Sequence, residues 1–160
     1  MSNGKSIDVR LGEWKATKES GAVLVIDRIG AGVGIVVIDL VTHICGGAHC
    51  ILPESPSKDL GNAGKFTNMA VPAIVEELLK LGAQKGKMVA KLAGGAQMLS
   101  QTVLSERNVG GAREALRKIP IPVTGEDVGG KFIRSLQVNS TSGEVLCLRL
   151  EGPQKTQIKL

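Results

Sequence analysis

Runs of apolar and β-branched residues dominate the first third of the chain. Residues 22–29, 33–41 and 44–52 are of this kind, and glycine or polar residues separate them. Such runs over four to eight positions are typical of strands with at least one buried face. Residues 7–15 alternate more weakly and predict an edge strand.

The middle of the chain changes to a helical period. Between Asn68 and Gly82 the apolar residues recur every three or four positions, which predicts an amphipathic helix. Asn68 is a candidate N-cap, Pro72 would fall in the first turn, and Gly82 would end the helix. A second amphipathic helix is predicted over 108–119, and a short helical stretch near 96–104.

The remaining segments predict further strands. Lysine alternates with apolar residues over 87–93, which indicates a strand with one face in solvent. Residues 131–139 and 144–150 flank a turn, and the alternating tail 154–160 predicts a last edge strand. Many strands with two main helices favour an α+β fold of packed layers, in a single domain over residues 1–160.

Composition and charge exclude several functional classes. The net charge of +5 is mild and comes from scattered lysines and arginines, and the only aromatic residues are Trp14, Phe66 and Phe132. Because basic runs are absent and rings for base stacking are scarce, we expect no nucleic-acid binding. No apolar run approaches the ~20 residues of a membrane span, so we expect no membrane insertion. The odd number of cysteines and the absence of a signal core favour the cytoplasm.

Two patterns suggest cofactor chemistry, and neither has the required context. Gly30–Gly34 follows a strand but is spaced G-x-G-x-G and leads into another strand, so no dinucleotide site is expected. His43, Cys45, His49 and Cys50 could suggest a metal site. In a regular strand, however, residues 45 and 49 lie ~13 Å apart, too far for shared coordination unless the intervening glycines bulge. We therefore expect neither a metal nor a cofactor.

His49 is the strongest candidate for catalysis. It lies at a strand end, between the small residues Gly46-Gly47-Ala48 and a proline-rich loop that begins at Pro53. Strand ends and loops of this kind often carry functional sites.

Five segments in this order resemble the CheD family, the chemoreceptor glutamine deamidases of bacterial chemotaxis. They are LGEW (11–14), GGAHCILPES (46–55), GKFTNMAVPAIVEELLKLGA (64–83), KLAGGAQM (91–98) and EDVGGKFIRSLQVNSTSGEV (126–145). The resemblance implies a layered α-β sandwich related to the catalytic domain of cytotoxic necrotizing factors. It also implies a mechanism, in which a cysteine activated by a histidine attacks a receptor glutamine. A threonine orients the histidine. Ammonia leaves as a thioester forms between the cysteine and the side chain, and water then hydrolyses the thioester to give glutamate and the free thiol.

Carried over residue by residue, the family's site is incomplete in this chain. Its histidine falls on His49, but its nucleophilic cysteine falls on Gly32 and the preceding serine on Ala31. Its orienting threonine falls on Ile26, and Arg28 replaces a residue that is usually small. Glycine has no side chain to attack with, and isoleucine cannot accept a hydrogen bond. The chain is therefore interpreted as a divergent member without the nucleophilic cysteine.

Three hypotheses follow for the function. In the first, the chain has lost most deamidase activity and acts by binding chemoreceptor cytoplasmic helices or a CheC-type phosphatase. In the second, it is an active glutamine amidohydrolase whose nucleophile has moved to Cys45 or Cys147 beside His49, whereas Cys50 would point to the opposite face. In the third, the emptied pocket beside Gly32 binds a small ligand.

Overall fold

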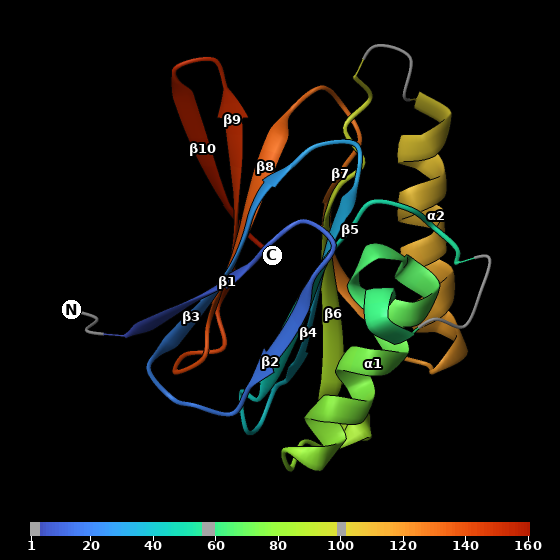
Figure 1. The fold of residues 1–160 in the computed structure, drawn as a ribbon. Coiled ribbons are helices and arrows are strands. Elements are labelled where there is room, and N and C mark those ends of the chain that lie inside the picture. Colours follow the sequence, from blue (N-terminus) through green and yellow to red (C-terminus); the bar gives the residue numbers. More distant parts are fainter. Residues whose placement is uncertain (1–3, 56–59, 99–101) are drawn as a thin grey trace.

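In the computed structural model, residues 4–55, 60–98 and 102–160 are described, and they form three layers (Figure 1). Two five-stranded sheets face each other, and two α-helices cover the outer side of one of them. The predicted α+β fold of packed layers is confirmed.

The first sheet is built from strands near the two ends of the chain. In spatial order its strands are β1 (Lys5–Val9), β3 (Ala22–Ile29), β8 (Ile133–Asn139), β9 (Val145–Glu151) and β10 (Gln154–Lys159). β1 pairs with β3 in parallel, and the other neighbours are antiparallel. The predicted edge strand in the tail is confirmed as β10.

The second sheet lies between the first sheet and the helices. In spatial order its strands are β2 (Trp14–Thr17), β5 (Cys45–Cys50), β4 (Val33–Asp39), β6 (Met88–Gly94) and β7 (Val123–Val128). β4 is buried along its whole length because helices cover one of its faces and the first sheet covers the other.

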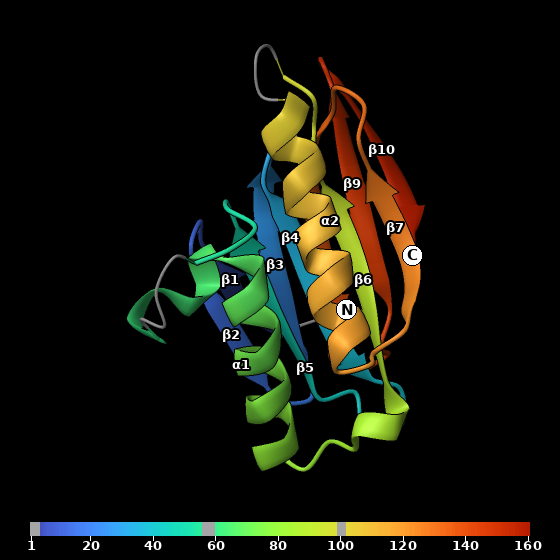
Figure 2. The same ribbon diagram turned by 90° about the vertical axis from the view of Figure 1, so that its right-hand side faces the viewer.

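The helices lie side by side across the second sheet, as Figure 2 shows. They are α1 (Thr67–Lys80) and α2 (Thr102–Lys118), and two short 3₁₀ segments, η1 (Leu60–Lys65) and η2 (Lys85–Lys87), lie before α1 and before β6. One hydrophobic core fills the space between helices and sheet, and a second fills the space between the two sheets. Both are aliphatic, which explains how the fold tolerates so few aromatic residues.

Two strand predictions were partly wrong, and one strand was missed. The segment 7–15 forms two strands, because Gly12 adopts a φ of 81° and turns the chain between β1 and β2. β7 was not predicted at all. Of the predicted solvent face over 87–93, Lys87 is exposed but precedes β6, and within β6 only Lys91 is partly exposed, because the helices cover one face of this strand and the first sheet covers the other.

The helix boundaries also differ from those predicted. α1 begins at Thr67 and its N-cap position is Phe66, so Asn68 is not the cap; its Oδ1 instead accepts a hydrogen bond from the Ser55 N–H at 3.1 Å. Pro72 lies in the second turn and not in the first. Gly82 does follow the end of the helix, with a φ of 108°.

The second helix is longer than the segment over which the apolar pattern predicted it. α2 begins six residues before the predicted start at 108 and ends at Lys118. The short helix predicted near 96–104 is replaced by irregular chain up to residue 98 and by the first turn of α2 from Thr102, while 99–101 lie outside the described residues.

Candidate functional site

His49 lies near the end of β5, opposite Gly34 of β4. Its side chain is 4% exposed. Neighbouring strand residues point to opposite faces, and both Ala48 and Cys50 belong to the core beneath the helices. The imidazole therefore points away from the helices, toward the first sheet.

A cavity of about 450 Å³ opens beside this imidazole. The turn after β1 contributes Arg10 and Leu11 to its wall, and the end of β3 contributes Asp27 and Arg28. The backbone of this turn is tied to β5, because the Gly12 N–H donates to the His49 carbonyl at 2.8 Å. The cavity is thus built from three strand ends around one histidine.

Asp27 is the charged neighbour of His49. Burial lowers the pKa of His49, and the Asp27 carboxylate acts against that shift and raises the pKa. Asp27 is itself held in place, since its Oδ1 accepts hydrogen bonds from the Ser135 hydroxyl and from the Arg28 N–H. The sequence analysis missed Asp27, although a charged residue at the end of an apolar strand was a usable signal.

Arg28 occupies an uncommon backbone conformation. Its φ is 53°, in the left-handed region that side chains other than glycine rarely adopt. The pairing of β3 with β8 is irregular between Ile26 and Ile29, so the strand bulges here. The bulge places the Arg28 side chain, which is 87% exposed, at the mouth of the cavity.

Gly32 lies in a closely packed turn. A Cβ built at this position would overlap the carbonyl oxygen of Cys50. The turn is fixed on its other side by α2, where the Asn108 Nδ2 donates to the Ala31 carbonyl at 3.1 Å and to the Ile51 carbonyl at 3.2 Å. The backbone therefore leaves no room for a nucleophilic side chain at residue 32. Sequence analysis also missed Asn108, which is fully buried.

Ile26, on which the family's orienting threonine falls by resemblance, carries an aliphatic side chain. It is fully buried between the sheets. Its side chain lies over the glycines of the facing strands, and a Cβ on Gly47 would come within 3.0 Å of its Cδ1. This position is an aliphatic contact between the layers.

The cysteines show no features of an activated thiol. The register of β5 with β4 is unbroken from Cys45 to Cys50, so no bulge brings Cys45 toward His49. Burial raises the pKa of Cys45 to about 11 and also raises that of Cys50. Burial and the nearby Asp127 raise the pKa of Cys147 to about 12. Thiols with raised pKa values are poor nucleophiles near neutral pH.

A second polar cluster lies at the far side of the sandwich, around Asp127. This carboxylate accepts hydrogen bonds from Arg134 Nε and Arg149 Nε, each at 2.8 Å. Arg134 is 1% exposed and also donates to the Gly94 carbonyl at 3.1 Å. The Arg149 hydrogen bond is the main cause that lowers the pKa of Asp127 to about 2, and burial opposes it. We interpret this cluster as structural, because its charges are paired within the protein.

The described residues contain no group of three or more histidine, cysteine, aspartate or glutamate side chains that could hold a metal ion. Within the same part of the chain, no helix has both the length and the apolar character needed to cross a membrane.

Comparison with known proteins agrees with this architecture. The family model described as CheD chemotactic sensory transduction matches residues 51–149. The chain is 41% identical to a probable chemoreceptor glutamine deamidase CheD 2 of Geobacter metallireducens, over 94% of this chain and 98% of the relative. It is 36% identical to a probable chemoreceptor glutamine deamidase CheD of Caldanaerobacter subterraneus subsp. tengcongensis, over 89% and 91%. It is 33% identical to the corresponding protein of Pyrococcus abyssi, over 94% and 95%. This chain therefore belongs to the CheD family.

Proposed function

We propose that this chain is a cytoplasmic chemotaxis protein that binds chemoreceptor helices and has lost most of its glutamine deamidase activity. The packing of Gly32 carries this proposal: a side chain there would overlap the Cys50 carbonyl oxygen. A simple replacement of a cysteine by glycine would leave an empty space. Here the backbone of β5 occupies that space, which favours a site adapted to work without the thiol.

The binding part of the proposal rests on the cavity beside His49. Its volume of about 450 Å³ is large enough for a glutamine or glutamate side chain together with part of a receptor backbone. Leu11 is 61% exposed at its edge and offers an apolar contact for a helix. A CheC-type phosphatase is the second partner that we propose for the same surface.

The expected loss of catalysis is large. Removing the nucleophile from a serine or cysteine hydrolase typically lowers kcat by on the order of 10⁴–10⁶. His49 and the cavity alone would then give only slow hydrolysis by water.

The test measures ammonia release and binding on the same receptor cytoplasmic fragment, which carries its glutamines. We expect no ammonia above the uncatalysed rate, whereas a family member with the intact cysteine releases it under the same conditions. Calorimetry should show saturable binding, which Arg28→Glu weakens and the distant Arg117→Glu does not. Absence of saturable binding to both the receptor fragment and a CheC-type protein would contradict the proposal.

The alternative function, an amidohydrolase with a relocated cysteine, makes the opposite prediction. The chain would release ammonia, and one of the variants Cys45→Ala, Cys50→Ala and Cys147→Ala would abolish that release. The raised pKa values of the three thiols weigh against this alternative.

A further inference from the structure

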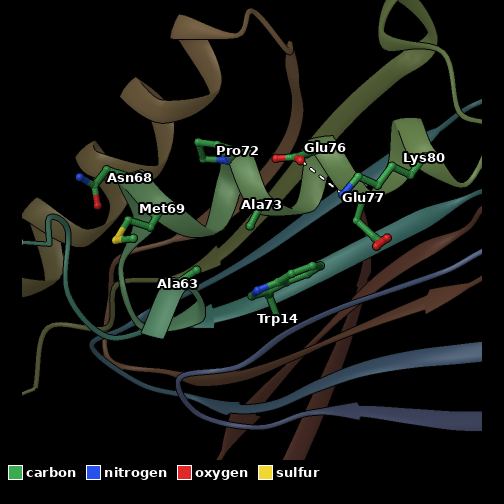
Figure 3. A pocket seen from close by; sticks show the side chains of 9 residues that line it. All are labelled: Trp14, Ala63, Asn68, Met69, Pro72, Ala73, Glu76, Glu77 and Lys80. Atoms are coloured by element: carbon green, nitrogen blue, oxygen red, sulfur yellow. Dashed lines mark ion pairs between the residues drawn. The ribbon is translucent and has the colours of Figure 1, made fainter. Parts of the chain in front are cut away.

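A second cavity lies on the opposite side of β5, between α1 and β2 (Figure 3). Its volume is about 530 Å³. One wall is a stripe along α1 from Met69 to Lys80, and the other is formed by Trp14 and Ala63. We call this cavity the Trp14 groove. It shares no residue with the cavity beside His49.

The chemistry of the Trp14 groove changes along its length. At one end Met69, Pro72 and Ala73 present apolar surface, and at the other end Glu76 and Glu77 present carboxylates. Eleven helical positions separate Met69 from Lys80, so the stripe is about 16 Å long at 1.5 Å per residue. A ligand that matches the groove is therefore elongated, with an apolar end and a cationic end.

The acidic end combines a carboxylate with an aromatic face. Trp14 is half-buried and its indole lies below Ala73 and Glu77 in Figure 3. Glu76 is partly neutralised by an ion pair with Lys80 at 3.4 Å. Glu77 is half-buried, and its carboxylate has no ion pair or hydrogen bond within the described residues. An indole face beside a carboxylate is a favourable place for a guanidinium or ammonium group.

We propose that the Trp14 groove binds a segment of a partner protein in which apolar residues are followed by arginine or lysine. The apolar side chains would cover Met69 and Ala73, and the cationic group would lie between the Trp14 ring and the Glu77 carboxylate. The exposed rim at Pro72 and Glu76 suits a peptide that runs along the surface better than an enclosed small molecule.

Because the chain as a whole is positively charged, binding of a cationic peptide would indicate a local acidic site. With a net charge of +5, the protein as a whole repels cationic peptides. Affinity for a basic segment must therefore come from a local acidic surface, and Glu77 with Trp14 supplies one.

Trp14 is also the natural probe, because the chain has one tryptophan and no tyrosine. The full chain is titrated with a short acetylated and amidated peptide that carries two leucines one helical turn apart, followed by two arginines. A second peptide has citrulline, which is neutral and of the same shape, in place of both arginines. We expect a saturable change in Trp14 emission with the arginine peptide and at least about tenfold weaker binding of the citrulline peptide.

Three variants test the location. Glu77→Gln keeps the shape and should weaken the arginine peptide about tenfold, and Ala73→Phe should fill the groove and abolish binding. Glu114→Gln changes an exposed carboxylate on α2 and should leave binding unchanged. Circular dichroism checks that each variant is folded.

The proposal fails if neither fluorescence nor calorimetry detects saturable binding of the arginine peptide to the native chain. It also fails if the citrulline peptide binds equally well, or if Glu114→Gln weakens binding as much as Glu77→Gln. A concentration-dependent dimer that Ala73→Phe disrupts would show instead that a second copy of this chain covers the groove.

Discussion

Two polar clusters of this protein contrast in how completely their charges are paired. Around Asp127, two arginines and a thiol all contact one carboxylate, and Arg134 also reaches a backbone carbonyl. Around His49, the imidazole faces an open cavity, and among the described residues it has no hydrogen bond and only the electrostatic influence of Asp27. Internal pairing identifies a cluster that holds the fold together, whereas polar groups facing a cavity identify a place for a ligand.

The largest effect is expected at the paired cluster. Asp127→Asn leaves the buried Arg134 guanidinium without its carboxylate, and breaking a buried ion pair costs about 3–5 kcal/mol of unfolding free energy. The matched control is Glu126→Gln, which removes the more exposed pair with Arg113 and should cost less than about 1 kcal/mol. Urea unfolding measures both variants, and equal losses would contradict the distinction.

The second effect tests the packing of the turn at residue 32. Gly32→Ala should cost about 1–3 kcal/mol, because its methyl group displaces the Cys50 carbonyl. Gly110 in α2 has open space around it, so Gly110→Ala should stabilise the protein by up to about 1 kcal/mol. If Gly32→Ala is neutral in thermal unfolding, the turn does have room for a side chain at residue 32.

The third effect is the pH dependence of the His49 region. Because burial lowers the pKa of His49, the unfolded chain binds a proton at a higher pH than the folded protein does. The corresponding stability is present above about pH 6.5 and is lost as the pH falls toward the folded pKa, with a slope of at most about 1.4 kcal/mol per pH unit. Urea unfolding between about pH 5 and 7 measures this slope.

His49→Gln should remove this contribution to the slope. Asp27→Asn removes the carboxylate that raises the pKa of His49, so proton NMR should record a still lower pKa for that histidine. An unchanged His49 titration in the Asp27 variant would mean that Asp27 does not influence the imidazole.

The smallest effect concerns the bulge at the mouth of the cavity. Since Arg28 has a φ of 53°, Arg28→Gly should be more stable than Arg28→Ala by about 1 kcal/mol. At the exposed Arg107, in the interior of α2, the order should reverse, because glycine is unfavourable in a helix by a similar amount. The same order at both positions would show that residue 28 is not strained.

The sequence predicted most of the strands, because their apolar runs are strong local signals. β7 was not predicted, because Val123–Val128 carries polar residues at exposed positions. It also pairs in parallel with β6, and a contact between segments so far apart in the chain leaves no local pattern in the sequence. The predicted face of β6 failed for a related reason. Lysine alternation indicates an exposed face only when no other layer covers that face, and here the helices cover one side of β6 and the first sheet covers the other.

The residue types of the candidate site could be predicted from the sequence, whereas the way these residues pack could not. The sequence placed His49, Gly32 and Ile26 together through resemblance to the CheD family. It could not show that the Cys50 carbonyl closes over Gly32, because that contact depends on the exact course of β5 past the turn. Asp27 and Asn108 were missed because their roles come from hydrogen bonds to segments more than 50 residues away in the chain.

The three buried cysteines can be used to measure how the layers of this protein open. Cys50 faces the core beneath the helices, whereas Cys45 and Cys147 face the space between the two sheets. Reagents that label thiols can reach Cys50 only when the helices lift from the sheet, and the other two only when the sheets separate. The labelling rates of single-cysteine variants would therefore measure, layer by layer, which interface of the sandwich opens first.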